Sequence, residues 1–133
     1  DEVVEKVDQL GISEYFFFAG LSNSVGNWLE EMDLFLLTSR IEGLPNVIIE
    51  AQGFGLPVIS TNAGGAAEVM IPNLTGRVSA KSQAPDIARV LLESIDDREW
   101  LNNASMVSRT HAREKFSVKG MYTRLLGLYD EFD

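Results

Sequence analysis

The amino-acid sequence predicts an α/β fold built on a parallel sheet. In the first 80 residues, short apolar runs rich in aromatic or β-branched residues alternate with stretches of helical periodicity, and only helical periodicity follows them. Such alternation is typical of parallel sheets, because a crossover between parallel strands needs a covering helix. With 133 residues and 45% hydrophobic content, the chain can build one buried core.

Four segments are predicted to be buried strands: residues 15–19, 34–37, 57–60 and, with a weaker pattern, 77–79. Three segments between them are predicted to be helices: residues 25–32, residues 46–55 and a shorter one that opens at Ala66. Residues 2–10 are predicted to form the last turns of a helix that Gly11 ends, so we expect a βα unit to begin upstream.

Three further helices are predicted after residue 80, each with one apolar face. The faces of the first two comprise Ile87, Val90, Leu91 and Ile95, and then Trp100, Leu101, Ala104, Val107 and His111. Ser117 is the predicted N-cap of the third, whose face comprises Val118, Tyr122, Leu125, Leu128, Tyr129 and Phe132. We expect a structural role for His111 and packing roles for Trp28 and Trp100.

Composition narrows the possible partners. With 20 acidic and 11 basic residues, the formal charge is -9, which disfavours nucleic acid and an anionic membrane surface as partners. An anionic small molecule is still compatible, because a helix N-terminus supplies local positive potential. The chain has no cysteine, which suits a reducing compartment such as the cytoplasm, and it has no apolar run of about 20 residues. We expect membrane association only through regions outside this chain.

Two loops are the expected binding region, because ligands of parallel α/β sheets bind at the carboxyl ends of the strands. In the loop after residue 37, Pro45 is suited to opening a helix whose first amides, near Asn46 and Val47, would face the cleft. Glu42 precedes this helix and Glu50 lies within it. Helical side chains lean toward the N-terminus, so both carboxylates can face one ligand and accept from vicinal hydroxyls. The alternative is that each merely complements the helix dipole, worth about 0.3 to 1 kcal/mol.

The second loop, residues 61–68, carries the paired glycines Gly64 and Gly65 ahead of a helix start. Paired glycines allow positive φ and close backbone approach, which suits a cradle for a phosphate or a sugar. A plain turn is the alternative, and Glu68 is expected to act as a cap or dipole partner.

The motifs of the chain resemble the donor-binding domain of family 4 glycosyltransferases. The resemblance rests on SRIEGLPN at 39–46, EA at 50–51, GLPVI at 55–59 and GGAAE at 64–68, and it extends to FAG at 18–20, LTGRV at 74–78, KFS at 115–117 and LY at 128–129. It implies a Rossmann-like three-layer parallel sheet with C-terminal helices, forming a truncated C-terminal domain of a GT-B enzyme. Residues 1–133 would then be one partial domain, with the N-terminal acceptor domain outside the chain.

The same resemblance implies a function. The parent protein would transfer a hexose-type sugar from a UDP- or GDP-sugar to a glycan or lipid, with retention of configuration and without a metal or other cofactor, in polysaccharide or glycoconjugate synthesis. Glu42 would be the catalytic residue beside the donor sugar, and Glu50 would bind the ribose. Backbone groups of residues 43–46 would bind sugar and diphosphate, namely those of Gly43, Leu44, Pro45 and Asn46. The fragment alone is expected to be inactive.

The sequence departs from the family in two respects. Ala66-Ala67 replace an apolar residue and a proline, and a basic pair that grips the diphosphate is not in the chain, since Arg40, Arg77 and Lys81 do not match it. These three cations are expected at the solvated surface or in local ion pairs. Two alternative functions stay open: a nucleotide-sugar epimerase of the same fold, and a non-catalytic nucleotide-sugar-binding module.

Overall fold

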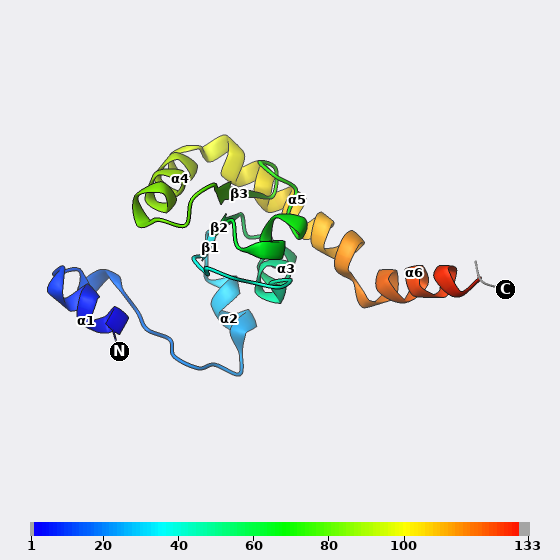
Figure 1. Ribbon diagram of the computed structural model, residues 1–133, viewed down its shortest axis with the longest axis horizontal. Helices are drawn as coiled ribbons and strands as arrows, with labels where there is room; N and C mark the ends of the chain where they lie inside the picture. The colour runs from blue at the N-terminus through cyan, green and yellow to red at the C-terminus, as the bar shows by residue number, and fades with distance from the viewer. Residues whose placement is uncertain (1, 131–133) are drawn as a thin grey trace.

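A computed structural model describes residues 2–130 as an alternation of helices and strands followed by helices alone (Figure 1). The elements in chain order are α1 (Glu2–Gln9), the 3-10 helix η1 (Ser13–Tyr15), α2 (Val25–Glu30), β1 (Phe35–Leu37), α3 (Asn46–Gly53), β2 (Val58–Thr61), the 3-10 helix η2 (Gly64–Glu68), β3 (Gly76–Ser79), α4 (Ala84–Asp96), α5 (Arg98–Phe116) and α6 (Val118–Asp130). The predicted α/β class is confirmed.

The three strands form one parallel sheet in the order β1-β2-β3. Phe35 of β1 is opposite Val58 of β2, which is opposite Gly76 of β3. All four residues of the central strand β2 are buried, as expected for a strand covered on both faces. Because the strands are parallel, their carboxyl ends lie at one edge of the sheet, where the predicted binding loops begin.

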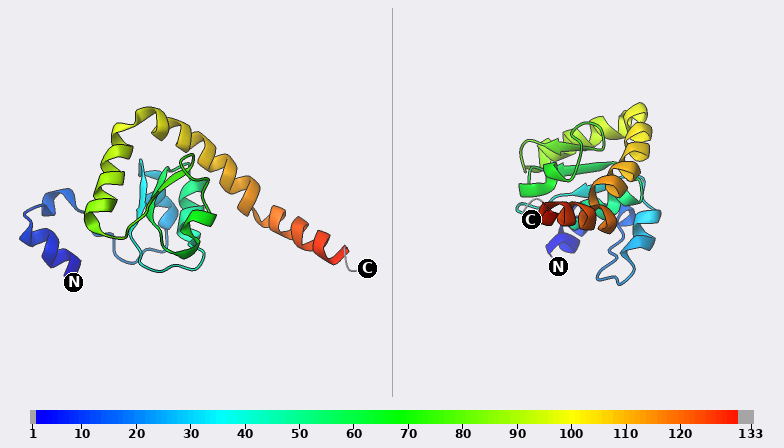
Figure 2. Two further views of the ribbon diagram at one scale, coloured as in Figure 1. Left: turned by 45° about the horizontal axis from the view of Figure 1, so that its top comes forward. Right: turned by 90° about the vertical axis from the view of Figure 1, so that its right-hand side faces the viewer.

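Helices cover both faces of the sheet and cross one of its edges. Figure 2 shows α4 on one side of the strands and α3 on the other. The helix α5 packs against α3, and its first half passes the segments that lead into β1 and β2. The main core lies between α3, β2 and the end of η2, where these residues are buried: Leu29, Ile48, Ala51, Leu56, Val58, Ala66, Val69 and Met70.

Two helices lie apart from this body, α1 at one end and α6 at the other (Figure 1). The predicted opening helix is confirmed, and Gly11 follows its end with φ of +66°, where its amide donates to the Asp8 carbonyl. Along residues 2–130, no helix is both long enough and apolar enough to cross a bilayer.

The prediction of a strand at residues 15–19 is wrong. Tyr15 ends the 3-10 helix η1, and the segment after it is irregular. The side chains of Phe16, Phe17 and Phe18 are 46 to 77% exposed. The aromatic run has the composition of a strand, but a strand is stable only when a neighbour accepts its backbone hydrogen bonds, and no described strand pairs with it.

The short helix predicted to open at Ala66 is present, but its start and its type differ from the prediction. The segment forms the short 3-10 helix η2, which begins earlier, at Gly64, and ends at Glu68. Directly after it, the amide of Ile71 donates to the Thr75 hydroxyl and the amide of Thr75 donates to the Ile71 carbonyl. This turn takes up the chain before β3, so the helical segment stays short.

The three C-terminal helices are present as predicted, but their buried faces differ: on α5 Ser108 and Ala112 are buried, and the predicted apolar face of α6 is exposed along the described residues. Val90 is buried as expected, whereas Ile95 is 42% exposed and Ser94 is buried in its place. The Ser94 hydroxyl donates to the Val90 carbonyl and accepts from Arg77, so its polar atom is satisfied. The predicted N-cap is confirmed, since the Ser117 hydroxyl accepts from the Gly120 amide at 3.1 Å. Phe132 lies outside the described residues.

Candidate functional site

The loops that follow β1 and β2 are joined at the carboxyl edge of the sheet. The Thr61 hydroxyl, at the end of β2, donates to the Ser39 carbonyl at 2.5 Å. The Gly65 amide donates to the Gly43 carbonyl at 2.9 Å. Two segments that are more than 20 residues apart thus form one surface at the predicted place.

The paired glycines are required for this contact. A Cβ atom on Gly64 would lie 2.1 Å from the Glu42 carbonyl oxygen, and one on Gly65 would lie 2.3 Å from the Gly43 carbonyl oxygen. Gly64 also has φ of +56°, which side-chain-bearing residues rarely adopt. The plain-turn interpretation is therefore insufficient, because the glycines bring one loop against the backbone of the glutamate loop.

The N-terminus of α3 opens at this junction. Pro45 is the N-cap residue, with φ of −75° and ψ of 97°, and no side chain caps the helix. Asn46 is therefore the first helical residue, one position later than a proline-led helix would have it. The first amides of a helix have no intrahelical acceptor, so α3 presents polarised N–H groups at the edge where ligands of such sheets bind.

The two glutamates flank this helix start but have different surroundings. Glu42 is half-buried beside Gly64, in the joined loops. Glu50 is exposed and lines a hollow of about 400 Å³ between α3 and the junction of α5 with α6. The walls of that hollow are Leu44, Asn46, Ile49, Glu50, Lys115, Phe116, Met121 and Arg124. Three predicted site residues thus share one hollow, and Glu42 lies in the adjoining loops.

Sequence reasoning missed the residues that α5 and α6 bring to this region. Lys115 and Arg124 add two cations to the Glu50 hollow, in a chain whose net charge is -9. Gln52 and His111 reach the end of η2. The helical spacing of His111 and Lys115 places them on one face of α5. Nothing in the sequence indicates that this face meets η2, because that contact depends on the path of α5.

Arg77, one of the three cations considered in the sequence, and the two tryptophans have mainly structural contacts. Arg77 pairs with Asp97 at 2.6 Å, which confirms the prediction of a local ion pair. The guanidinium also lies 4.2 Å from the ring centre of Trp100. Trp100 is buried and donates to the Asn73 carbonyl. Trp28 is 38% exposed and packs against Phe17, so its packing role is confined to the surface.

Asp97 and His111 have shifted pKa values, and both lie outside the joined loops. The pKa of Asp97 lies below its ordinary value of 3.8, because the Trp100 amide and the Arg77 side chain donate to the carboxylate. Burial lowers the pKa of His111, which favours the neutral ring.

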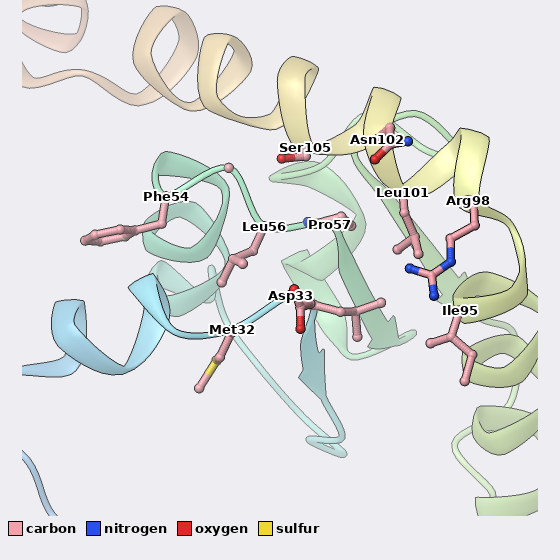
Figure 3. A pocket seen from close by; sticks show the side chains of 12 residues that line it. Met32, Asp33, Phe54, Leu56, Pro57, Ile95, Arg98, Leu101, Asn102 and Ser105 are labelled. Atoms are coloured by element: carbon pink, nitrogen blue, oxygen red, sulfur yellow. The ribbon is translucent and has the colours of Figure 1, made fainter.

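A second hollow, of about 430 Å³, lies at the opposite edge of the sheet (Figure 3). It is lined by Asp33 and Leu34, which precede β1, by Pro57, which precedes β2, and by Arg98 and Asn102 of α5. It is slightly larger than the Glu50 hollow. A helix also begins there, since Arg98 is the first residue of α5, but the Asp97 side chain caps that helix by accepting from the Trp100 amide, whereas no side chain caps α3. We therefore assign the candidate ligand site to the carboxyl edge, which has the joined glycine loops and the uncapped helix N-terminus.

The described residues contain no group of three histidine, aspartate or glutamate side chains placed to hold a metal ion. The candidate site at the carboxyl edge combines backbone amides, two glutamates and two cations. Groups of these kinds can bind hydroxyls and phosphate oxygens.

Comparison with known proteins shows the family of the chain. The sequence profile of the family described as Glycosyl transferases group 1 matches residues 1–97, and the chain belongs to that family. The Vi polysaccharide biosynthesis protein VipC/TviE of Salmonella typhi is 40% identical over 124 residues, which cover 90% of this chain and 21% of that protein. A GDP-mannose-dependent phosphatidylinositol monomannoside mannosyltransferase of Corynebacterium glutamicum is 32% identical over 96% of this chain and 33% of its own length.

Solved structures show the same fold. HepE of Anabaena, crystallised in complex with UDP, superposes with a TM-score of 0.89 at 22% identity, over 98% of this chain and 36% of that chain. The C-terminal domain of LpcC, a group 1 glycosyl transferase of Francisella tularensis, has a TM-score of 0.75 at 23% identity, over 88% of this chain and 62% of that one. These neighbours support the Rossmann-like GT-B class. The chain spans about a fifth to a third of the curated relatives described above.

Proposed function

We propose that this chain is the donor-binding part of an enzyme that transfers a hexose-type sugar from a UDP- or GDP-sugar, with retention of configuration, to a glycan or lipid. The junction of the glutamate loop with the glycine loop at an uncapped helix N-terminus carries the proposal. Solved HepE structures hold UDP and UDP-glucose, and a relative uses GDP-mannose by name, which supports a nucleotide sugar as donor.

Each group has a role in this proposal. The amides of Asn46 and Val47 stabilise the diphosphate, most strongly as negative charge develops on the leaving phosphate. Lys115 and Arg124 add positive potential beside it. Glu50 accepts hydrogen bonds from the ribose hydroxyls, and Glu42 is the catalytic residue that stabilises the reacting sugar. An N-terminal domain of the same protein supplies the acceptor site, in polysaccharide or glycoconjugate synthesis.

Calorimetric titration of the chain with UDP, GDP, UDP-glucose and GDP-mannose tests the donor site. We expect one base to be preferred, and Glu50→Ala to weaken that binding about tenfold or more, since a hydrogen bond to a charged group contributes about 1.5 to 3 kcal/mol. The matched control is Glu93→Ala, which removes an exposed carboxylate on α4. Equal affinity of wild type and Glu50→Ala would refute the assignment of Glu50.

Glu42→Gln in the intact protein separates the enzyme from the two alternatives. The transferase proposal predicts unchanged donor affinity and turnover reduced at least about a hundredfold, within the range for losing one group that stabilises transition-state charge. A binding module would show no turnover in either form. An epimerase would convert the nucleotide sugar with no acceptor present, which product analysis detects.

A further inference from the structure

The end of η2 is held by side chains from two helices. The Gln52 amide nitrogen, from α3, donates to the Val69 carbonyl at 2.7 Å, and the Nε2 atom of His111, from α5, lies 3.3 Å from the same oxygen. Lys115, one turn beyond His111, donates to the Glu68 carbonyl at 3.0 Å. Two consecutive carbonyls just after the glycine loop thus receive three side-chain contacts.

Gln52 is an unusual choice for its position. The side chain is fully buried, and its carbonyl oxygen Oε1 has no hydrogen-bond partner among the described residues. A buried unpaired acceptor costs stability that an apolar residue of the same size would not. The amide nitrogen spans from the Ile48 carbonyl of its own helix to Val69. What Gln52 provides in return is a hydrogen bond that fixes the distance between α3 and the end of η2.

The His111 ring is oriented for the same contact. It lies edge-on to Phe116, with ring centres 5.7 Å apart, and it is half-buried. A carbonyl oxygen is only an acceptor, so a neutral His111 carries its proton on Nε2. Because Lys115 is on the same face of α5, this helix contacts two consecutive carbonyls of one short segment.

Val69 follows the glycines after only one short helix. The helix η2 has five residues, so Gly64 and Glu68 are separated by only about 8 Å of 3-10 helix. Ala66 and Val69 are fully buried, which prevents the segment from bending outward. At its other end, Gly65 is bonded to Gly43, next to Glu42. The segment can therefore carry a displacement from α5 to the loop of the catalytic glutamate.

We propose that Gln52 and His111, assisted by Lys115, are positioning residues that hold the Gly64–Gly65 loop against the Glu42 loop in the geometry that binds the donor. This inference rests on the proposed function, because it concerns the donor site named there. None of the three residues needs to touch the sugar.

Three variants of the chain test the inference: Gln52→Met and His111→Phe, which keep size and apolar packing but lose the donors, and Lys115→Met. Hydrogen exchange at the bonded amides of Gly65 and Ala66 is measured together with affinity for whichever of UDP-glucose and GDP-mannose the wild type binds. We expect about tenfold faster exchange in Gln52→Met and a smaller increase in His111→Phe, with affinity lowered in the same order. Lys115→Met also removes a charge beside the diphosphate, so for this variant only the exchange rate, which should rise slightly, tests positioning.

Two controls separate positioning from general loss of stability. Val90→Ala weakens the core at α4 without touching η2, and Lys119→Met removes a charge on α6, four residues after Lys115. In both control variants, exchange at the amides of Gly65 and Ala66 and the affinity for the nucleotide sugar should stay as in the wild type. Unaltered local exchange in Gln52→Met, or lost affinity in Val90→Ala as well, would overturn the inference alone. A wild-type chain that binds neither nucleotide sugar would overturn the proposed function and this inference with it.

Discussion

Gly64 and Gly65 show how single residues build the site. Neither glycine binds a ligand through a side chain, yet without them the backbone of the second loop could not approach Glu42 and Gly43. The sequence indicates a flexible or closely approached loop at this point, but it does not reveal what the loop approaches. That partner is fixed by the parallel register of β1 and β2, which brings the two loops to one edge.

Gly65→Ala should destabilise the fold and disrupt the site. The new Cβ meets a backbone oxygen at 2.3 Å, so the loops must separate, and we expect a loss of about 1 to 3 kcal/mol in the free energy of unfolding, with donor binding lost. Chemical denaturation and calorimetry measure both effects. Gly53→Ala, at the end of α3 with open space around its Cβ position, is the matched control and should be neutral or slightly stabilising. Equal behaviour of the two variants would show that the loops are not in contact.

Asp97 makes the stability of the fold depend on pH in the acid range. Because its folded pKa lies below 3.8, the carboxylate stabilises the fold above that pH and loses this contribution as pH falls through the folded pKa. Asp97→Asn still accepts from the Trp100 amide but cannot titrate. We therefore expect wild type to be the more stable at pH 6, with the difference shrinking below pH 3.8, as urea unfolding at several pH values measures. If the stability difference between wild type and Asp97→Asn did not vary with pH, Asp97 would not be the group that makes the fold sensitive to acid.

At the scale of elements, the structure contains each predicted strand that has a neighbouring strand to pair with, and it lacks the one predicted strand that has none. Residues 34–37, 57–60 and 77–79 form the parallel sheet nearly as predicted, whereas residues 15–19 do not form a strand. Side-chain pattern predicts that a segment can be a strand, but pairing decides whether it is one. The same limit applies to η2, whose type depends on the turn before β3.

The helix α6 is one of the two helices that lie apart from the body of the molecule (Figure 1). Its apolar side chains are exposed, including Met121, Tyr122 and Leu125, so its stability rests largely on local interactions such as the Ser117 cap. Ser117→Ala should weaken α6 by about 1 kcal/mol and raise hydrogen exchange there about fivefold, without changing exchange in α5.

Thr123→Ala is the control for that variant, since the Thr123 hydroxyl bonds within α6 to the Lys119 carbonyl and does not cap the helix. It should change exchange in α6 little. If Ser117→Ala instead raised exchange equally in α5 and α6, the two helices would unfold as one unit and the view of α6 as a separate element would be wrong.

At the scale of the whole molecule, an acidic chain has an edge suited to an anion. The net charge is -9, yet the carboxyl edge of the sheet has the α3 N-terminus, Lys115 and Arg124. The opposite edge carries the second hollow, with Arg98 as its cation. The net charge disfavours extended polyanions as partners but says nothing about which edge of the sheet suits a small anion, because that depends on where the helices end.

The most direct test of the account is to map the amide chemical shifts of the chain during titration with UDP-glucose and GDP-mannose. The account predicts that the perturbed amides are those of residues 42–47 and 64–66, with Glu50 and Lys115 beside them. Perturbations centred instead on Asp33, Arg98 and Asn102 would place the ligand in the hollow at the other edge of the sheet and contradict the assignment of the donor site.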